Sequence, residues 1–306
     1  MKKTMVSDAD RSGVIAVPPL CRAGDGSFDW AENDKVVAHL LRGGVTRLMY
    51  GGNAFVYHLT LAEYGEMLAW LSGLDDGIWC VPGAGPSFGR LMDQAALLRK
   101  FNFPCAMALP CADPRDAAGL ETGLRRFSSE ADMPVIVYLK QEGDFGADRM
   151  AGLDAVARLV DDGVCVGVKY AVVRHDAGID PYLAALLERV DRRFVISGIG
   201  ERPAIAHLKD FGLPGFTSGS VCVAPAQTQA IFDLCKQGEW TAASELRQLF
   251  LPHEDLRDGW GPARVLHASV ELAGIARTGP VAPFLSGLSD EQMAELGPVA
   301  KALYQA

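Results

Sequence analysis

The sequence is built on a repeat in which short apolar runs, rich in Val, Ile and Met, alternate with segments of helical periodicity. Successive runs start roughly 30 residues apart, which is the length of one strand-helix unit. Runs that are apolar on both faces are typical of parallel strands covered by helices on both sides. The runs are eight in number: Gly13–Leu20, Thr46–Gly52, Ile78–Gly85, Cys105–Pro110, Val135–Lys140, Val164–Tyr170, Arg193–Gly200 and Gly215–Ser220.

Eight parallel strands joined by right-handed crossovers close most simply into an α/β fold of the (β/α)8 TIM-barrel type. An open, doubly wound sheet is the alternative, and it requires a glycine-rich nucleotide-binding turn after its first strand. The stretch 17–22, Val-Pro-Pro-Leu-Cys-Arg, supplies no such turn, so the barrel is favoured. The helices predicted between the strands are Asp34–Gly43, Thr60–Ser72, Phe88–Phe101, Glu121–Ala131, Arg149–Asp161, Pro181–Val190 and Pro203–Phe211.

Strand signals stop after Ala224, and the remaining sequence has helical periodicity. No low-complexity linker separates it from the preceding repeats. We therefore expect a barrel catalytic domain over residues 1–223 and a helical extension over 224–306 that packs on the barrel. The helices predicted in the extension are Gln227–Lys236, Trp240–His267 and Ser289–Leu303.

Charge and composition restrict the partners of the chain. The 306 residues carry a net charge of −9, which argues against nucleic acid or an anionic membrane as the main partner. No apolar run of about 18 residues predicts a membrane span, and no signal peptide is evident. The seven cysteines are scattered, several within apolar runs, which predicts reduced thiols in a cytoplasmic protein. The six histidines show no metal-binding spacing, so no metal is expected.

Lys169 is the sharpest candidate for chemistry. In the run Val164–Tyr170, strand alternation places Cys165, Gly167 and Lys169 on one face and valines on the other. The valines suit a helix-packed outer face, so we expect Lys169 to point into the barrel. Burial lowers the pKa of an amine, and a neutral amine condenses with a ketone to form a Schiff base. The alternative is a strand-end lysine that reaches solvent.

Tyr138 strengthens the case for Lys169. It stands near the carboxyl end of the preceding predicted strand, and active sites of (β/α)8 barrels lie at that end. A phenol close to the amine can carry the protons that carbinolamine formation and dehydration require. A core tyrosine with a hydrogen-bonded hydroxyl is the alternative interpretation.

Beside the Tyr138 and Lys169 strands, six other stretches carry a recognisable pattern: Gly13–Leu20, Asp25–Asp29, Gly51–Thr60, Ile196–Gly198, Gly215–Ser220 with Pro225, and Ala273–Ile275. In their order along the chain, these segments resemble the dihydrodipicolinate synthase / N-acetylneuraminate lyase family of Schiff-base class I aldolases, as a divergent member. The resemblance covers nearly the whole chain. It implies Lys169 as the imine-forming residue, Tyr138 as the proton relay, a 2-oxo acid as substrate, no cofactor, and a homotetramer built as a dimer of dimers.

The departures from the family pattern bear on the substrate. The family's second strand ends in Gly-(Thr/Ser)-Thr-Gly-Glu, which holds the carboxylate of a 2-oxo acid, whereas this chain has Gly51-Gly52-Asn53-Ala54-Phe55. Backbone N–H groups of Gly52 and Asn53 remain able to cradle a carboxylate. The synthases also carry a tyrosine after strand 4 and an arginine after strand 5. Here those regions read Pro110-Cys111-Ala112 and Leu139 to Gly143, which argues against dihydrodipicolinate synthesis itself.

Three further residues at the ends of predicted strands are candidates for substrate binding: Lys140, Gly198 and Ser218. Lys140 would share the face of Tyr138 and clamp a carboxylate, or it is a solvated loop lysine beside Glu142. Arg174 and His175, which follow strand 6, are weaker candidates for distal contacts.

Two functional hypotheses follow from different classes. The first is a carbon-carbon or carbon-oxygen lyase, in which Lys169 binds pyruvate or a deoxy-keto sugar acid for aldol cleavage or condensation, or for dehydration. The second is a catalytically impaired barrel that binds a ligand or acts as a scaffold. The altered strand-2 motif and the missing tyrosine favour the second hypothesis, and the Lys169–Tyr138 pair favours the first.

Overall fold

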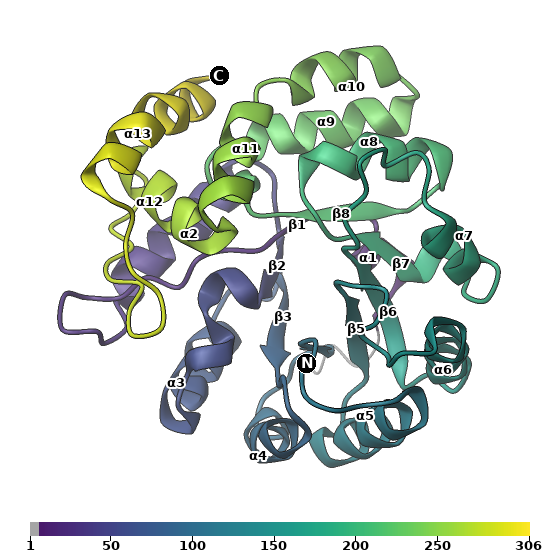
Figure 1. Ribbon diagram of the computed structural model, residues 1–306. Coiled ribbons are helices and arrows are strands. Elements are labelled where there is room, and N and C mark those ends of the chain that lie inside the picture. Colours follow the sequence, from purple (N-terminus) through teal and green to yellow (C-terminus); the bar gives the residue numbers. More distant parts are fainter. Residues whose placement is uncertain (1–5) are drawn as a thin grey trace. The chain divides into compact units, whose positions relative to one another are not determined.

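The computed structural model describes residues 6–306. Its eight parallel strands follow one another around a closed barrel in chain order, and helices alternate with them (Figure 1). The predicted fold class is therefore confirmed, and each strand is shorter than its apolar run. The strands are β1 (Gly13–Ala16), β2 (Arg47–Tyr50), β3 (Trp79–Ala84), β4 (Ala106–Ala108), β5 (Val135–Leu139), β6 (Cys165–Tyr170), β7 (Val195–Ser197) and β8 (Gly215–Ser218).

A short helix that the sequence analysis did not predict, α1 (Asp8–Arg11), precedes the barrel. The other helices of the repeat occupy the predicted segments, with differences at their ends. They are α2 (Trp30–Arg42), α3 (Leu61–Ser72), α4 (Phe88–Leu98), α5 (Ala117–Ala131), α6 (Arg149–Asp161), α7 (Pro181–Leu187) and α8 (Glu201–Asp210).

Two helices begin about one turn earlier than predicted because an aspartate caps each of them. The Asp29 side chain accepts a hydrogen bond from the N–H of Glu32, so α2 begins at Trp30 and not at Asp34. The Asp116 side chain accepts from the N–H of Gly119, so α5 begins at Ala117 and not at Glu121. The apolar periodicity marks only the buried face of each helix, which starts after the cap.

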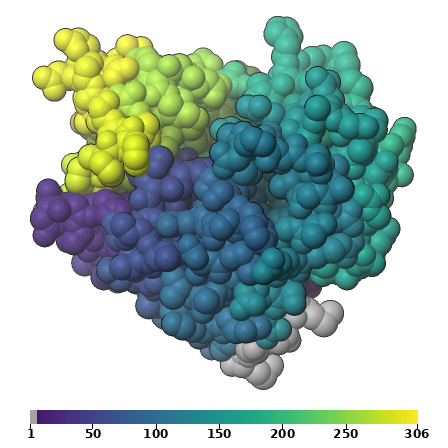
Figure 2. All heavy atoms as spheres, turned by 60° about the horizontal axis from the view of Figure 1, so that its bottom comes forward, coloured from purple at the N-terminus to yellow at the C-terminus, as the bar shows by residue number. Residues whose placement is uncertain are grey.

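The segment after β8 is helical, as predicted, but Trp240–His267 is not one helix. It forms three, because Pro252 lies at the first turn of a new helix, and Gly261 adopts φ 100° immediately before Pro262. The helices of this segment are α9 (Pro225–Gln237), α10 (Trp240–Arg247), α11 (Leu251–Trp260), α12 (Pro262–Leu272) and α13 (Asp290–Gln305). The last residues of α13, yellow in Figure 2, lie at the surface, where Tyr304 is exposed.

Contacts within the chain group it into two compact units. The first comprises the described residues up to Gly13, Leu59–Ile199 and Ala206–Phe216, and it contains β3 to β7 with α3 to α7. In this unit α5 packs on α4 and α6, and the Glu121 carboxylate binds Arg125 on its own helix and Arg158 on α6. The predicted boundary between residues 223 and 224 stays a prediction.

The second unit comprises Val14–His58, Gly200–Ile205 and Thr217–Ala306. It contains β2 and α2 together with α9 to α13. A Cβ atom at Gly43, the residue after α2, would lie 2.4 Å from Cβ of Pro225, so the glycine allows α2 to approach α9 closely. Helix α12 packs against the turn η1 (Gly52–Ala54) that follows β2.

The cysteines are free, and all but Cys111 are buried. Burial raises the pKa of the Cys80 thiol to about 12, which leaves it an unreactive thiol at neutral pH. No helix within residues 6–306 combines the length and the apolar composition needed to cross a membrane.

Candidate active site

Lys169 is a buried lysine in β6, and its side chain is 4% exposed. It shares a strand face with Gly167, where an added Cβ atom would meet side-chain atoms of Ile136 at 3.3 Å and Arg11 at 3.7 Å. At Gly167 that face is therefore closely packed. Lys169 is therefore almost completely shielded from solvent.

Tyr138 lies opposite Lys169 on the neighbouring strand. Parallel pairing of β5 with β6 sets Tyr138 against Lys169 in register. The Lys169 Nζ atom lies 4.5 Å from the centroid of the Tyr138 ring, and Tyr138 is half-buried. The amine and the phenol are therefore held together by a regular strand ladder and not by a mobile loop, which is how positioned acid-base groups are normally supported.

Gly198, at the end of β7, allows the close approach of the Lys169 strand. Its N–H donates a 2.6 Å hydrogen bond to the Tyr170 carbonyl oxygen. A Cβ atom at position 198 would lie 2.7 Å from that oxygen, 2.8 Å from Cβ of Ala171 and 3.0 Å from Cγ of Lys169. Gly198 therefore borders the stem of Lys169, and its predicted contact with substrate stays a prediction.

Gly52 and Asn53 form the turn η1 immediately after β2. The Asn53 side-chain amide donates to the Val17 carbonyl oxygen at 2.7 Å, and the Asn53 carbonyl oxygen accepts from Nε2 of His267 at 2.9 Å. Phe55 ends the turn with φ 53°, and its ring stacks on His267 with centroids 4.7 Å apart. Side-chain contacts from α12 thus fix the turn that is proposed to bind carboxylate.

Ser218 ends β8 and is buried. Its hydroxyl donates to Glu201 Oε1 at 2.7 Å and accepts from the N–H of Val221 at 3.0 Å. The hydroxyl is thus engaged within the protein, and a contact with substrate, which the sequence suggested, stays a prediction.

A pair of buried carboxyl groups lies beside Ser218, and the sequence analysis missed it. Glu201 Oε1 also accepts from the Thr228 hydroxyl at 2.9 Å. Glu254 Oε1 accepts from the backbone N–H groups of Glu201 at 3.0 Å and Arg202 at 3.2 Å, which caps α8. Because of this cap, α8 begins at Glu201 and not at the predicted Pro203. The earlier start could not be predicted, because the capping residue, Glu254, is distant in the sequence.

Both carboxyl groups favour the neutral form. Glu201 is 0% and Glu254 4% exposed, and Oε2 of each has no hydrogen-bond partner among residues 6–306. Burial raises the pKa of Glu201, and burial together with the neighbouring Glu201 carboxyl group raises the pKa of Glu254 to about 8. The pair therefore binds at least part of a proton at neutral pH.

This pair predicts a pH dependence of stability. Because the pKa of Glu254 is higher in the folded chain than its ordinary value of 4.5, the free energy of unfolding is expected to fall between about pH 5 and pH 8, with a slope of up to ~1.4 kcal/mol per pH unit. Glu254→Gln keeps an oxygen that caps α8 and removes the ionisation, so its slope is expected to be smaller. Urea denaturation at several pH values measures both slopes. Asp255→Asn, on an exposed residue of the same helix, is the matched control, and equal slopes for Glu254→Gln and wild type would contradict the prediction.

Lys140 follows β5 and is exposed. Its backbone N–H donates to the Asp144 carboxylate at 2.6 Å, which fixes the turn after the strand. Arg174, in contrast, binds the carboxylates of Glu142 and Asp180, and His175 is exposed. Arg174 therefore has a structural partner on each side, whereas the role of Lys140 stays a prediction.

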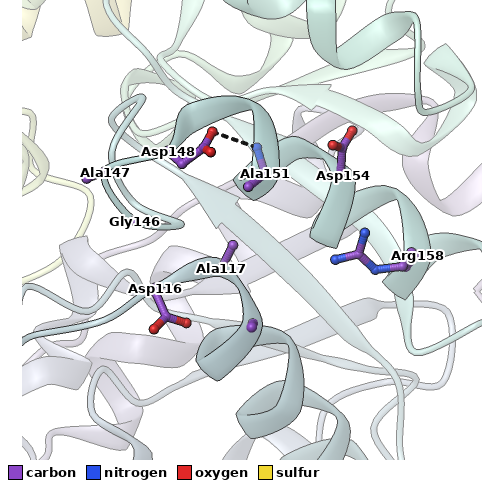
Figure 3. A pocket seen from close by; sticks show the side chains of 9 residues that line it. Asp116, Ala117, Gly146, Ala147, Asp148, Ala151, Asp154 and Arg158 are labelled. Atoms are coloured by element: carbon purple, nitrogen blue, oxygen red, sulfur yellow. Dashed lines mark hydrogen bonds between the residues drawn. The ribbon is translucent and has the colours of Figure 1, made fainter.

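A surface pocket of about 380 Å³ lies elsewhere in the first unit, between the starts of α5 and α6 (Figure 3). Its lining includes Asp116 and Asp148, whose side chains already cap the two helices, and Arg158. None of the candidate site residues lines it. Across residues 6–306, no group of three or more His, Cys, Asp or Glu side chains is arranged to hold a metal ion.

Comparison with known proteins finds solved structures of similar fold, but no family model and no curated protein with a matching sequence. A dihydrodipicolinate synthase from Oceanobacillus iheyensis has a TM-score of 0.83 at 22% identity and covers 98% of both chains. A structure of PhdJ bound to a substrate intermediate has a TM-score of 0.81 at 20% identity, and it covers 99% of this chain and 98% of that one. An N-acetylneuraminate lyase from Proteus mirabilis has a TM-score of 0.80 at 19% identity, and it covers 95% of this chain and 98% of that one.

The structure is a (β/α)8 barrel followed by C-terminal helices. The structural neighbours over nearly the full length are dihydrodipicolinate synthases and N-acetylneuraminate lyases, which confirms at the level of the fold the resemblance found in the sequence motifs. At identities near 20% the likeness establishes the fold, and the activity is a separate question.

Proposed function

We propose that this protein is a Schiff-base lyase in which the Lys169 amine forms an imine with the carbonyl carbon of a 2-oxo acid. The observation that carries this proposal is the buried Lys169 Nζ atom, 4.5 Å from the ring centroid of Tyr138 on the adjacent strand. A desolvated lysine amine is a nucleophile suited to imine formation, and a nearby phenol is a group that can transfer the protons.

The steps of imine formation assign a role to each residue. The nitrogen lone pair of Lys169 attacks the carbonyl carbon, the new C–N bond forms, and the carbonyl oxygen leaves as water after it has gained two protons. Tyr138 is the group that passes protons to and from this oxygen and the nitrogen. The iminium then accepts the electron pair released at the adjacent carbon, either when a C–C bond breaks or when a proton is removed before dehydration.

The substrate class is pyruvate or a deoxy-keto sugar acid. Gly52 and Asn53 are the proposed carboxylate-binding positions, with Lys140, Gly198 and Ser218 as further candidates. Cys111 and Ala112 stand where the synthases have a tyrosine, and the segment after β5 lacks their arginine, so a substrate other than that of dihydrodipicolinate synthase is proposed. The cytoplasmic location and the homotetramer stay predictions.

Reductive trapping tests the proposal. The protein is incubated with pyruvate and a series of 2-oxo sugar acids, reduced with borohydride, and weighed intact by mass spectrometry. We expect an increase in mass equal to the 2-oxo acid minus its carbonyl oxygen, in wild type and not in Lys169→Met. Lys236→Met, at an exposed position on α9, is the matched lysine control and is expected to be trapped like wild type.

The alternative function, a barrel that binds a ligand without covalent chemistry, predicts a different result. In that case no 2-oxo acid gives an adduct, and Lys169→Met binds the ligand with nearly unchanged affinity. An adduct that persists in Lys169→Met would also overturn the proposed role of Lys169.

A further inference from the structure

Arg257, on α11, is an arginine whose guanidinium group packs against the backbone just after β8. A Cβ atom at Gly219 would lie 2.4 Å from Nη2 of Arg257 and 3.0 Å from its Cζ. The same point is 2.9 Å from Nδ2 of Asn53. The absence of a side chain at Gly219 therefore brings two N–H donors, one cationic and one neutral, to the same place at the carboxyl ends of β2 and β8.

A chain of hydrogen bonds fixes the position of Arg257. Ser269 donates its only hydroxyl proton to the Val265 carbonyl oxygen at 2.7 Å, so it accepts from Nε2 of His253 at 2.8 Å. Nδ1 of the neutral His253 ring then accepts the Ser220 proton at 3.0 Å. The Ser220 oxygen is left to accept from Nη1 of Arg257 at 3.2 Å.

The serine and histidine side chains of this hydrogen-bond chain are buried, and the histidine is not protonated at neutral pH. Ser220, His253 and Ser269 are each 0% exposed. Burial, and secondarily the nearby Arg257, lowers the pKa of His253 to about 3. The ring therefore stays neutral through the physiological range, and the direction of every bond in the chain is preserved.

Arg257 forms no ion pair with any residue in 6–306, and its charge acts at longer range on the buried Glu201 and Glu254, where, against the effect of burial, it lowers the pKa of each carboxyl group. The guanidinium group of Arg257 donates from Nε to the Pro262 carbonyl oxygen at 3.4 Å and from Nη1 to Ser220. Two other half-buried arginines, Arg125 and Arg174, bind carboxylates, whereas the half-buried Arg264, like Arg257, donates to backbone carbonyl oxygens. A cation that is held by neutral acceptors and forms no ion pair, beside an amide donor, is suited to bind a small anion.

We propose that Arg257 and the Asn53 side-chain amide form a subsite for a carboxylate group of the substrate, with Ser220, His253 and Ser269 as positioning residues. One carboxylate oxygen would accept from Nη2 of Arg257 and the other from the second Nδ2 proton of Asn53, whose first proton binds Val17. In this chain the cation for the carboxylate comes from a C-terminal helix. This inference rests on the proposed function for the identity of the substrate.

The test uses oxamate, a carboxylate that resembles pyruvate and whose amide carbonyl does not form an imine. Isothermal titration of the full-length protein is expected to show binding by wild type and binding weaker by roughly 10- to 100-fold in Arg257→Gln. Arg257→Lys, which keeps the charge, is expected to recover part of the affinity. Arg264→Gln, whose guanidinium group likewise binds backbone carbonyl oxygens, is the matched control and is expected to bind like wild type.

A second measurement separates this inference from the proposed function. Trapping of pyruvate by borohydride is repeated in Arg257→Gln, and the pyruvate concentration for half-maximal trapping is expected to rise by a similar factor. If wild type and Arg257→Gln are trapped at equal concentrations, the subsite is overturned and the Lys169 chemistry stands. If wild type binds oxamate through Arg257 and no 2-oxo acid is trapped, the subsite stands and the lyase proposal falls. Absence of oxamate binding by wild type would overturn the subsite directly.

Discussion

Replacing Tyr138 by phenylalanine is expected to slow imine formation by ~10²- to 10⁴-fold, the usual contribution of a positioned proton donor. The substitution removes one hydroxyl and keeps the ring that lies 4.5 Å from Lys169 Nζ. The amount of imine at equilibrium is therefore expected to be unchanged, whereas the time needed to reach it lengthens. Borohydride quenching at increasing times of incubation measures both quantities.

A second tyrosine provides the control for this experiment. The Tyr182 hydroxyl is buried and donates to the Glu142 carbonyl oxygen at 3.1 Å. Tyr182→Phe is expected to cost about 1 kcal/mol of stability and to leave the trapping rate unchanged. If Tyr138→Phe were trapped as fast as Tyr182→Phe, Tyr138 would not be the proton relay.

Gly198→Ala is expected to reduce imine formation by about 100-fold, because a new Cβ atom must displace the stem of Lys169 or the backbone beside it. That atom would lie 2.7 Å from the Tyr170 carbonyl oxygen and 3.0 Å from Lys169 Cγ. A displacement of about 1 Å in a reacting group is enough for a loss of this size. Overpacking is also expected to lower the free energy of unfolding by about 1–3 kcal/mol.

The control is a glycine that has space for a side chain. An added Cβ atom at Gly65, inside α3, meets no atom within 4 Å. Gly65→Ala is expected to be trapped like wild type and to be slightly more stable, because alanine favours the helix. Equal trapping of Gly198→Ala and Gly65→Ala would show that the packing around Lys169 does not limit the chemistry.

The regular part of the fold could be predicted because each element carries its own signal. The apolar run at Val164–Tyr170 marks a strand buried on both faces, and such runs repeated at the spacing of a strand-helix unit predict the barrel. Helix starts were predicted less well, since periodicity marks the buried face and caps precede it. The helix expected over Trp240–His267 was wrong because Pro252 and Gly261-Pro262 interrupt an apolar pattern that continues across them.

Candidate site residues could be predicted from the sequence only where they lie within a strand. Lys169 and Tyr138 lie within runs whose alternation and order along the chain bring them together. Glu254 and Arg257 lie on a helix far along the chain, and no local pattern links them to Glu201 or Ser220. Contacts of that kind depend on tertiary packing, which sequence periodicity does not encode.

The most direct test of the lysine chemistry is to locate the trapped group. Wild-type protein reduced with borohydride in the presence of an accepted 2-oxo acid is digested, and the modified peptide is sequenced by tandem mass spectrometry. We expect a single modified residue, Lys169, in the peptide that contains Val164–Tyr170. Modification of exposed lysines such as Lys140 and Lys236, with Lys169 unmodified, would contradict the proposed role of Lys169.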